Sequence, residues 1–154
     1  MSFFRSRKVA PVTSDFLLEC KDLVRHYGQI KPVDGVSLNL RPHELLSILG
    51  PSGCGKSTLL NLIAGLDEPQ AGEIFIGGEE MSSVHHIVAP ELRRVGMVFQ
   101  DIALFPHLNV FKNVAYGLNG SKDEKRSRVE EMLKLVELSG SEKKMPHELS
   151  GGEQ

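Results

Sequence analysis

One short segment of this sequence has the residue types and the spacing of a phosphate-binding loop. Residues 50–57 read GPSGCGKS and match the pattern G-x-x-x-x-G-K-[ST] in full. Glycines allow the backbone to turn its N–H groups onto phosphate oxygens, and a helix that follows adds the positive end of its dipole. Lys56 would hold the β- and γ-phosphates of a nucleotide, and the Ser57 hydroxyl would ligate Mg²⁺. The other contacts of the loop would come from Gly50, Pro51, Ser52, Gly53, Cys54, Gly55 and Thr58.

The flanking residues supply the elements that such a loop needs. The apolar run 45–49 predicts a strand before it, and LLNLIAG predicts a helix after it that ends at Gly65. Strand, glycine-rich loop and helix in this order make a chance match improbable. The loop alone does not choose among kinases, GTPases and transport ATPases.

A second segment with chemical meaning closes the sequence, which ends in LSGGEQ. Ser150 and Glu153 have the spacing of a capping box. In that box the serine oxygen accepts the N–H of the third helical residue, and the glutamate accepts the N–H of the serine. The pattern predicts the start of a helix, where exposed N–H groups can receive phosphate.

Four features in order resemble the ATPase subunits of ABC transporters: Tyr27, the phosphate loop, Gln100 after an apolar strand, and LSGGEQ after a helical insert. The resemblance begins near residue 16. It implies an α/β fold, a P-loop NTPase core of ABC-ATPase type with an N-terminal antiparallel β subdomain and a helical subdomain. By resemblance Tyr27 would stack on the adenine of ATP, and Gln100 would contact Mg²⁺ and the attacking water.

The same resemblance makes dimerisation part of the active site. Its signature residues, Ser150, Gly151 and Gly152, would contact the γ-phosphate held by the loop of a second subunit. Glu153 stands where the shortest family pattern, LSGGQ, has glutamine. The family's Walker B aspartate, catalytic glutamate, D-loop and switch histidine lie after the signature, so we expect the chain to be a fragment that lacks the C-terminal part of the core and competent hydrolysis.

The stretch RRVGMVFQDIALFPHLNVFKNVAYGL, residues 93–118, resembles importer subunits that serve iron(III), polyamines, sulfate-type anions or sugars. The expected function is ATP-driven import of a small solute, with a preference for iron(III) or a related ion or polyamine. The implied partners are a second ATPase subunit, transmembrane permease subunits and, indirectly, a solute-binding protein, at the cytoplasmic face of the cell membrane. Residues 104–107, LFPH, are either the permease docking surface or ordinary subdomain core.

Two other functions fit part of the pattern. A soluble ABC-type ATPase acting on ribosomes or DNA would usually carry two cassettes and basic elements, whereas this chain has a formal net charge of -2. A P-loop kinase for small molecules would explain the loop but not Gln100 and the signature. The adjacent His85 and His86 point in different directions and lack partners at helical spacing, which predicts a loop rather than a metal site.

Composition and periodicity outline the remaining organisation. We expect a tail over 1–15, the N-terminal part of the nucleotide-binding core over 16–100, and a helical subdomain over 101–154. Strands are predicted in 16–28 and 33–40, separated by turns near Gly28 and Gly35, with a hairpin at Gly77–Gly78 and a buried strand ending at Gln100. Asn109 would cap a helix that buries Val110, Phe111, Val114, Ala115 and Leu118; Ser121 and Glu124 would cap another that buries Val129, Met132, Leu133 and Val136.

Cysteine usage and hydropathy indicate the compartment. Cys20 and Cys54 lie far apart and have no metal-ligand spacing, which fits a reducing cytoplasm. The first residues lack the apolar stretch of a secretory signal, and no run approaches the roughly 18 uncharged residues that span a bilayer. Any role at a membrane would therefore be by association.

Overall fold

The computed structural model describes residues 15–100 and 103–154, and these fall into two compact units. The N-terminal unit extends through Met97 and the C-terminal unit begins at Val98, close to the boundary at residue 100 expected from the sequence. Of the tail expected over 1–15, residues 1–14 lie outside the described residues. Each unit is described by itself below.

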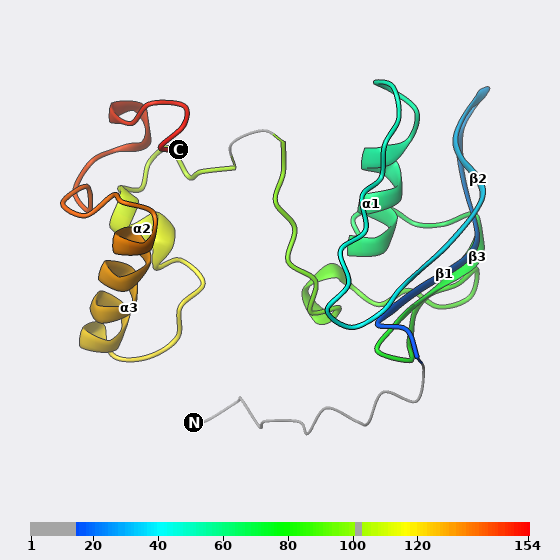
Figure 1. Ribbon diagram of the computed structural model, residues 1–154, viewed down its shortest axis with the longest axis horizontal. Coiled ribbons are helices and arrows are strands. Elements are labelled where there is room, and N and C mark those ends of the chain that lie inside the picture. Colours follow the sequence, from blue (N-terminus) through cyan, green and yellow to red (C-terminus); the bar gives the residue numbers. More distant parts are fainter. Residues whose placement is uncertain (1–14, 101–102) are drawn as a thin grey trace. The chain divides into compact units, whose positions relative to one another are not determined.

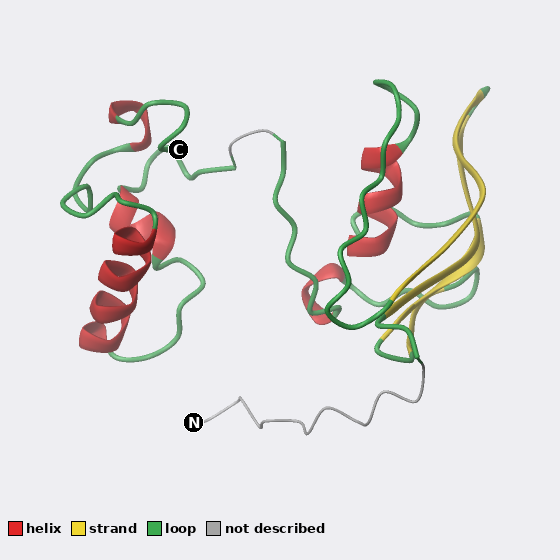
Figure 2. Ribbon diagram, in the orientation of Figure 1, coloured by secondary structure: helices red, strands yellow, loops and turns green. Residues whose placement is uncertain are grey.

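An antiparallel sheet forms the frame of the N-terminal unit (Figure 2). Its strands are β1 (Leu18–Tyr27), β2 (Ile30–Leu40), β3 (Ala71–Ile76) and β4 (Glu79–Ser82), in the order β2-β1-β3-β4. The hairpin predicted at Gly77–Gly78 is confirmed, because these two residues join β3 and β4 and both have positive φ. Such a turn follows the right-handed twist of the strands that it joins.

Gly35 was expected to form a turn, and this prediction is wrong. β2 continues through Gly35, and the register shifts there because Leu23 pairs with Val36 while Val24 pairs with Asp34. Gly35 has a φ of 72° and is the extra residue of a β-bulge. The turn predicted near Gly28 is confirmed, because Gly28 and Gln29 join β1 to β2.

Helix α1 (Lys56–Ala64) packs beside the sheet of the N-terminal unit (Figure 1). It ends at Gly65, as predicted, with a φ of 81° in the left-handed region that glycine adopts without steric cost. Leu59, Leu62 and Ile63 form its buried face. The sheet contributes the rest of this core, which comprises Cys20, Leu23, Val33, Ile74 and Met81.

Arg93 is a buried cation at the far end of α1, after the short 3-10 helix Pro90–Leu92. Its guanidinium donates to the carbonyl oxygens of Leu62 at 2.9 Å and Ile63 at 3.1 Å in the last turn of α1. It also donates to Val88 O at 2.8 Å and to Ser82 Oγ at 2.6 Å. A cation bound to the last carbonyls of a helix stabilises the negative end of its dipole.

Two predicted strands are wrong. Residues 45–49 and the segment ending at Gln100 are irregular, and Leu45 and Val98 are 92% and 98% exposed. A buried strand of a parallel sheet needs neighbouring strands and helices on both faces. In the part of the chain that the structure describes, the only sheet pairs β1 to β4 with one another, so neither segment has a partner strand.

The C-terminal unit contains α2 (Val110–Val114), α3 (Lys122–Leu135) and the 3-10 helix Pro146–Glu148. Both predicted caps are confirmed. Asn109 Oδ1 accepts the N–H of Lys112 at 3.0 Å, and Ser121 and Glu124 form a complete capping box. The core of the unit is formed by Val110, Val129, Leu133 and Leu149.

The burial predicted for the apolar residues of these two helices is partly wrong near the helix ends. Val136 and Val114 are exposed, whereas Phe111 and Leu118 are half-buried against the core. Val136 is already the C-cap residue of α3, with a φ of -101°, so it has left the helical face that carries Val129 and Leu133. No helix in residues 15–100 or 103–154 is long and apolar enough to cross a bilayer.

Candidate nucleotide-binding site

The phosphate loop leads directly into the N-terminus of α1. Gly55 is the N-cap residue, with a φ of 98°, and no side chain caps this end. The N–H of Leu59 is bonded to Gly55 O at 2.9 Å, so the earlier N–H groups of Lys56, Ser57 and Thr58 lie in the first turn, where helix geometry provides no carbonyl partner. The first turn carries no acidic residue, and these donors suit an anionic ligand.

Lys56 closes the loop on itself. Its Nζ donates to Gly50 O at 2.9 Å and to Pro51 O at 2.6 Å, so the ammonium lies across the mouth of the loop. The Cys54 sulfur is 3.6 Å from the same nitrogen. The ammonium is thus held by two carbonyl oxygens of the loop, and phosphate oxygens could replace these carbonyls as its acceptors. Ser57, the next residue, is exposed, and its hydroxyl is suited in type and position to act as a magnesium ligand.

A close backbone contact joins the loop to β2. A Cβ at Gly55 would lie only 1.9 Å from the carbonyl oxygen of Pro32, so no other residue fits there. Pro32 is two residues from Ile30, which pairs with Tyr27 across the hairpin. Two strand residues cover about 7 Å. The phosphate loop and Tyr27 therefore lie on neighbouring parts of the unit, as a ligand with phosphates at one end and a flat base at the other requires.

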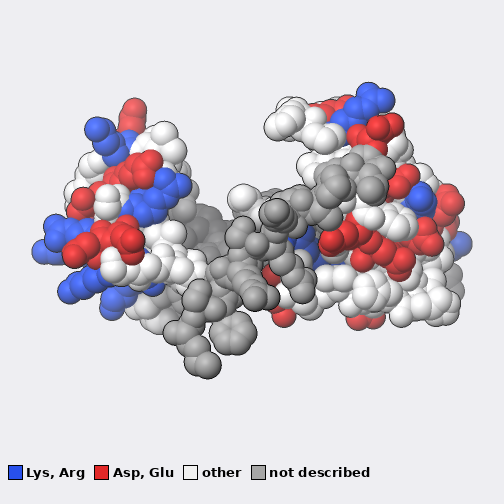
Figure 3. All heavy atoms as spheres, turned by 90° about the horizontal axis from the view of Figure 1, so that it is seen from below, with Lys and Arg blue, Asp and Glu red and all other residues white. Residues whose placement is uncertain are grey.

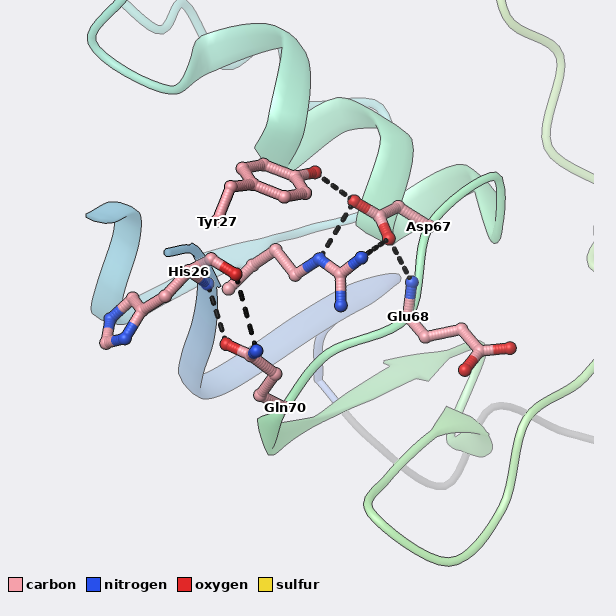
Figure 4. A network of polar contacts seen from close by, with 6 residues as sticks. His26, Tyr27, Asp67, Glu68 and Gln70 are labelled. Atoms are coloured by element: carbon pink, nitrogen blue, oxygen red, sulfur yellow. Dashed lines mark hydrogen bonds and ion pairs between the residues drawn. The ribbon is translucent and has the colours of Figure 1, made fainter. Parts of the chain in front are cut away.

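Tyr27 belongs to a network of polar contacts (Figure 4). Its hydroxyl donates to Asp67 Oδ2, and the guanidinium carbon of Arg25 lies 4.9 Å from the centre of its ring. Arg25 also binds Asp67 through both carboxylate oxygens, at 3.1 Å and 2.7 Å. The Gln70 amide bonds the backbone N–H of His26 at 2.7 Å and its carbonyl at 3.3 Å. The end of β1 is thereby joined to the loop that follows α1.

The Asp67 carboxylate is held in its charged form. Burial by itself raises its pKa, but the hydrogen bond from Tyr27, the Glu68 N–H at 2.8 Å and the charge of Arg25 together bring the pKa below its ordinary value. Hydrogen bonds that favour the ionised form of a carboxylate lower its pKa in this way. Asp67 is therefore a charged acceptor for Tyr27 and Arg25 at neutral pH.

The predicted glutamine and docking residues belong to the C-terminal unit. Gln100 is exposed in an irregular segment. Leu104 is half-buried and lines a cavity of about 380 Å³, whereas Phe105 stacks on Tyr116 with ring centres 4.3 Å apart. The Asn113 side chain accepts the N–H of Phe105 and donates to the carbonyls of Phe105, Leu108 and Asn109, which fixes the backbone of this loop.

The signature residues begin a helical turn, since the N–H of Gln154 bonds to Ser150 O at 3.1 Å. Half of the expected capping box is confirmed: Glu153 Oε2 accepts the N–H of Ser150 at 2.8 Å. The other half is wrong, because the Ser150 hydroxyl donates to the same carboxylate at 2.5 Å. A carboxylate is the stronger acceptor, so the hydroxyl turns toward it. These two bonds hold the pKa of Glu153 below its ordinary value.

Charged side chains of both signs occur on each unit in the face that Figure 3 shows. On α3 they form ion pairs along the helix, between Arg126 and Glu130 at 2.9 Å and between Arg128 and Glu131 at 2.6 Å. Pairs at this spacing are typical of a solvated helix face. His85 and His86 lie in the loop between Ser82 and Ile87, which form an isolated bridge.

Comparison with known proteins shows to which family the chain belongs. The family model described as ABC transporter matches residues 33–154, which include the phosphate loop, Gln100 and the signature. The chain belongs to the ABC transporter family. It is 45% identical to the sulfate/thiosulfate import ATP-binding protein CysA of Neisseria meningitidis, 46% to the putrescine transport ATP-binding protein PotG of Escherichia coli, and 47% to the Fe(3+) ions import ATP-binding protein FbpC of Brucella abortus.

These matches cover 86%, 89% and 87% of the chain but only 38%, 36% and 38% of the relatives. Among solved structures, the dimeric bacterial ABC transporter cassette MJ0796 has a TM-score of 0.76 at 35% identity. That match covers 88% of this chain and 64% of the cassette. The α/β fold expected from the resemblance, that of an ABC ATPase cassette, is thereby confirmed for the portion that the chain spans.

Several residues of the site were missed at the sequence level. Asp67, Arg25 and Asn113 carry no local pattern that distinguishes them from surface polar residues. Asp67 lies two residues beyond the helix stop at Gly65, and only the fold brings it to Tyr27, 40 positions earlier.

Proposed function

We propose that the chain is the ATP-binding part of an ATPase subunit that drives import of a small solute. The observation that carries this proposal is the phosphate loop at the uncapped N-terminus of α1, with Lys56 across its mouth, in a chain of the ABC transporter family. The named relatives are ATP-binding proteins of importers. The family match favours this function over a small-molecule kinase and over an ATPase acting on ribosomes or DNA.

Nucleotide binding follows from the groups in the N-terminal unit. The triphosphate would receive the first-turn N–H groups of α1 and the ammonium of Lys56, which would exchange the Gly50 and Pro51 carbonyls for phosphate oxygens. The adenine would stack on the exposed face of Tyr27. When bound, Mg²⁺ would neutralise charge on the β- and γ-phosphate oxygens, and the Ser57 hydroxyl is the group of this unit that would ligate it.

Hydrolysis in the whole protein would require two subunits. Ser150, Gly151 and Gly152 would contact the γ-phosphate bound by the partner's loop, at the start of the helical turn seen here. The Ser150 hydroxyl would then exchange Glu153 for a phosphate oxygen. The dimeric cassette among the similar structures supports this assembly.

The permease contact is assigned to residues 104–107. Phe105 and His107 form an edge-to-face pair on the surface, with ring centres 6.1 Å apart, and Asn113 fixes their loop. A preorganised, exposed aromatic cluster suits a protein partner. The ATPase subunit would thus act at the cytoplasmic face of the membrane, bound to permease subunits that receive their cargo from a solute-binding protein.

The cargo belongs to the class of small ions and polyamines. Relatives named for sulfate, putrescine and iron(III) are 45–47% identical, so identity gives no order among these solutes. Iron(III) stays our first hypothesis for the cargo, and transport assays with the permease partners would decide it.

Binding of MgATP by the 154-residue chain, measured by isothermal titration calorimetry, tests the core of the proposal. Lys56→Met should weaken binding about 10- to 100-fold, because a charge-assisted hydrogen bond contributes roughly 1.5–3 kcal/mol. Lys134→Met, which removes an exposed lysine of α3, is the matched control and should leave binding unchanged. Equal affinities for wild type and Lys56→Met would refute the proposal.

A further inference from the structure

The end of β1 carries a residue arrangement that nucleotide binding alone does not require. Asp67 receives both the Tyr27 hydroxyl and the forked guanidinium of Arg25, although it lies beyond α1 in the sequence. Its side chain is 16% exposed and that of Arg25 is 25% exposed, so the pair is largely shielded from water. Ion pairs in such settings keep a defined geometry better than pairs on the open surface.

These contacts fix the Tyr27 ring at two points. The hydroxyl is tied to Asp67, and the guanidinium carbon of Arg25 lies over the ring at 4.9 Å. Tyr27 as a whole is nevertheless 46% exposed. A ring whose hydroxyl is anchored and one of whose faces is occupied can offer only its other face to a planar ligand. It also loses little conformational freedom when that ligand stacks.

We propose that Asp67 is a positioning residue for base binding: with Arg25 it holds Tyr27 as a preorganised one-sided platform for the purine base of a nucleoside triphosphate. The inference rests on the proposed nucleotide binding and adds to it a residue from the loop after α1. In this role Asp67 would act on the base only through the ring of Tyr27, to whose hydroxyl it is bonded.

The same element thereby serves both ends of the ligand. Helix α1 presents its first N–H groups to the phosphates, and the loop that leaves its other end, through Gly65, supplies the carboxylate that orients the base platform. Stacking is tolerant of base identity, because every base has a π-face. ATP and GTP should therefore depend on Asp67 to the same extent.

Inorganic tripolyphosphate separates this role from a general effect on folding, because it has the phosphates and no base. We would measure the dissociation constants of ATP, GTP and tripolyphosphate for the 154-residue chain and its variants. Losing stacking altogether costs about 5- to 150-fold in affinity, and freeing the ring should cost part of this, about 5- to 10-fold for both nucleotides. Asp67→Ala should show this loss and bind tripolyphosphate as the wild type does.

Two further variants sharpen the result. Tyr27→Phe keeps the ring but removes the hydroxyl that Asp67 anchors, so it should also lose affinity for nucleotides only. The double variant Tyr27→Phe/Asp67→Ala should lose less affinity than the product of the two single losses, because both substitutions remove the same hydrogen bond. Asp34→Ala is the matched control: Asp34 pairs with His26 at 2.9 Å on the same hairpin and should leave all three affinities unchanged.

The outcomes distinguish the inference from the function on which it rests. If Asp67→Ala leaves nucleotide binding intact, or weakens nucleotides and tripolyphosphate equally, the positioning role is overturned while nucleotide binding stands. If the wild-type chain binds neither ATP nor tripolyphosphate, both are overturned. Selective loss of ATP and GTP in Asp67→Ala and Tyr27→Phe, with Asp34→Ala unchanged, establishes the platform.

Discussion

Replacing Arg93 with methionine should destabilise the N-terminal unit strongly. Methionine fills a similar elongated space but removes the guanidinium that donates to Val88 O, Ile63 O, Leu62 O and Ser82 Oγ. Leu62 O keeps the Gly65 N–H at 3.2 Å, whereas the guanidinium is the donor that the structure shows for the other three acceptors.

The magnitude follows from these acceptors. Each buried acceptor left without a donor costs about 1–3 kcal/mol. Against this, methionine avoids the several kcal/mol that desolvating a cation costs, an effect also seen in the pKa of Arg93, which burial lowers. We expect a net loss of about 3 kcal/mol in the free energy of unfolding, which is large beside the roughly 5–15 kcal/mol of a whole domain.

Urea unfolding followed by far-ultraviolet circular dichroism measures this loss. With a slope of about 2 kcal/mol per molar urea, the midpoint of Arg93→Met should fall by about 1.5 M. The neighbouring Arg94 is exposed, so Arg94→Met is the matched control and should shift the midpoint by less than about 0.3 M. Equal midpoints for the two variants would refute the role assigned to the buried guanidinium.

Three further predictions follow from the same structure. Leu133→Ala should cost about 2–5 kcal/mol because Leu133 is 2% exposed, and Leu135→Ala, at a site 75% exposed, should be close to neutral; thermal unfolding checks both, and similar losses would contradict the packing of α3. Gly55→Ala should abolish ATP binding, because its Cβ would strike the Pro32 carbonyl of β2. In Gly53→Ala the new Cβ meets no atom within 4 Å, and the substitution should cost only about 1 kcal/mol of backbone strain. Calorimetric titration with ATP compares the two variants, and equal losses of affinity would refute the close approach of Gly55 to Pro32. The Asp67 pKa is lowered in the folded chain, so its stabilisation is complete above the unfolded value of about 4 and is lost as the pH falls through the folded value. The difference in unfolding free energy between wild type and Asp67→Asn should be constant from pH 7 to 5 and shrink as the pH is lowered below about 4. A difference that stays constant below about pH 4 would exclude this carboxylate as its source.

Local chemistry was predicted well from the sequence. The glycine stop of α1, the Gly77–Gly78 hairpin and the caps at Asn109 and Ser121 each depend on residues within a few positions of one another. Such features can be predicted from a short stretch of sequence, because they depend on a glycine at a strained backbone position or on a side chain that bonds a backbone group in the adjacent turn. The signature was recognised for the same reason, although the direction of the Ser150 hydroxyl was not.

The strand and turn predictions that failed depended on distant partners. The apolar segments 45–49 and 95–99 have the composition of buried strands, but composition does not state whether neighbouring strands are present. A bulge and a turn both use a glycine at positive φ, so Gly35 by itself fits either, and only the register of β2 with β1 separates the two.

The sequence by itself determined to which family the chain belongs and where a phosphate-binding loop is predicted, because both depend on contiguous motifs. The tertiary structure decided how Tyr27 is held and which acceptors the Arg93 guanidinium binds. Asp67 reaches Tyr27 across 40 positions and Arg93 reaches Leu62 across 31. Contacts over such separations arise from the pairing of β1, β2 and β3 and the packing of α1, for which no local pattern of residues is required.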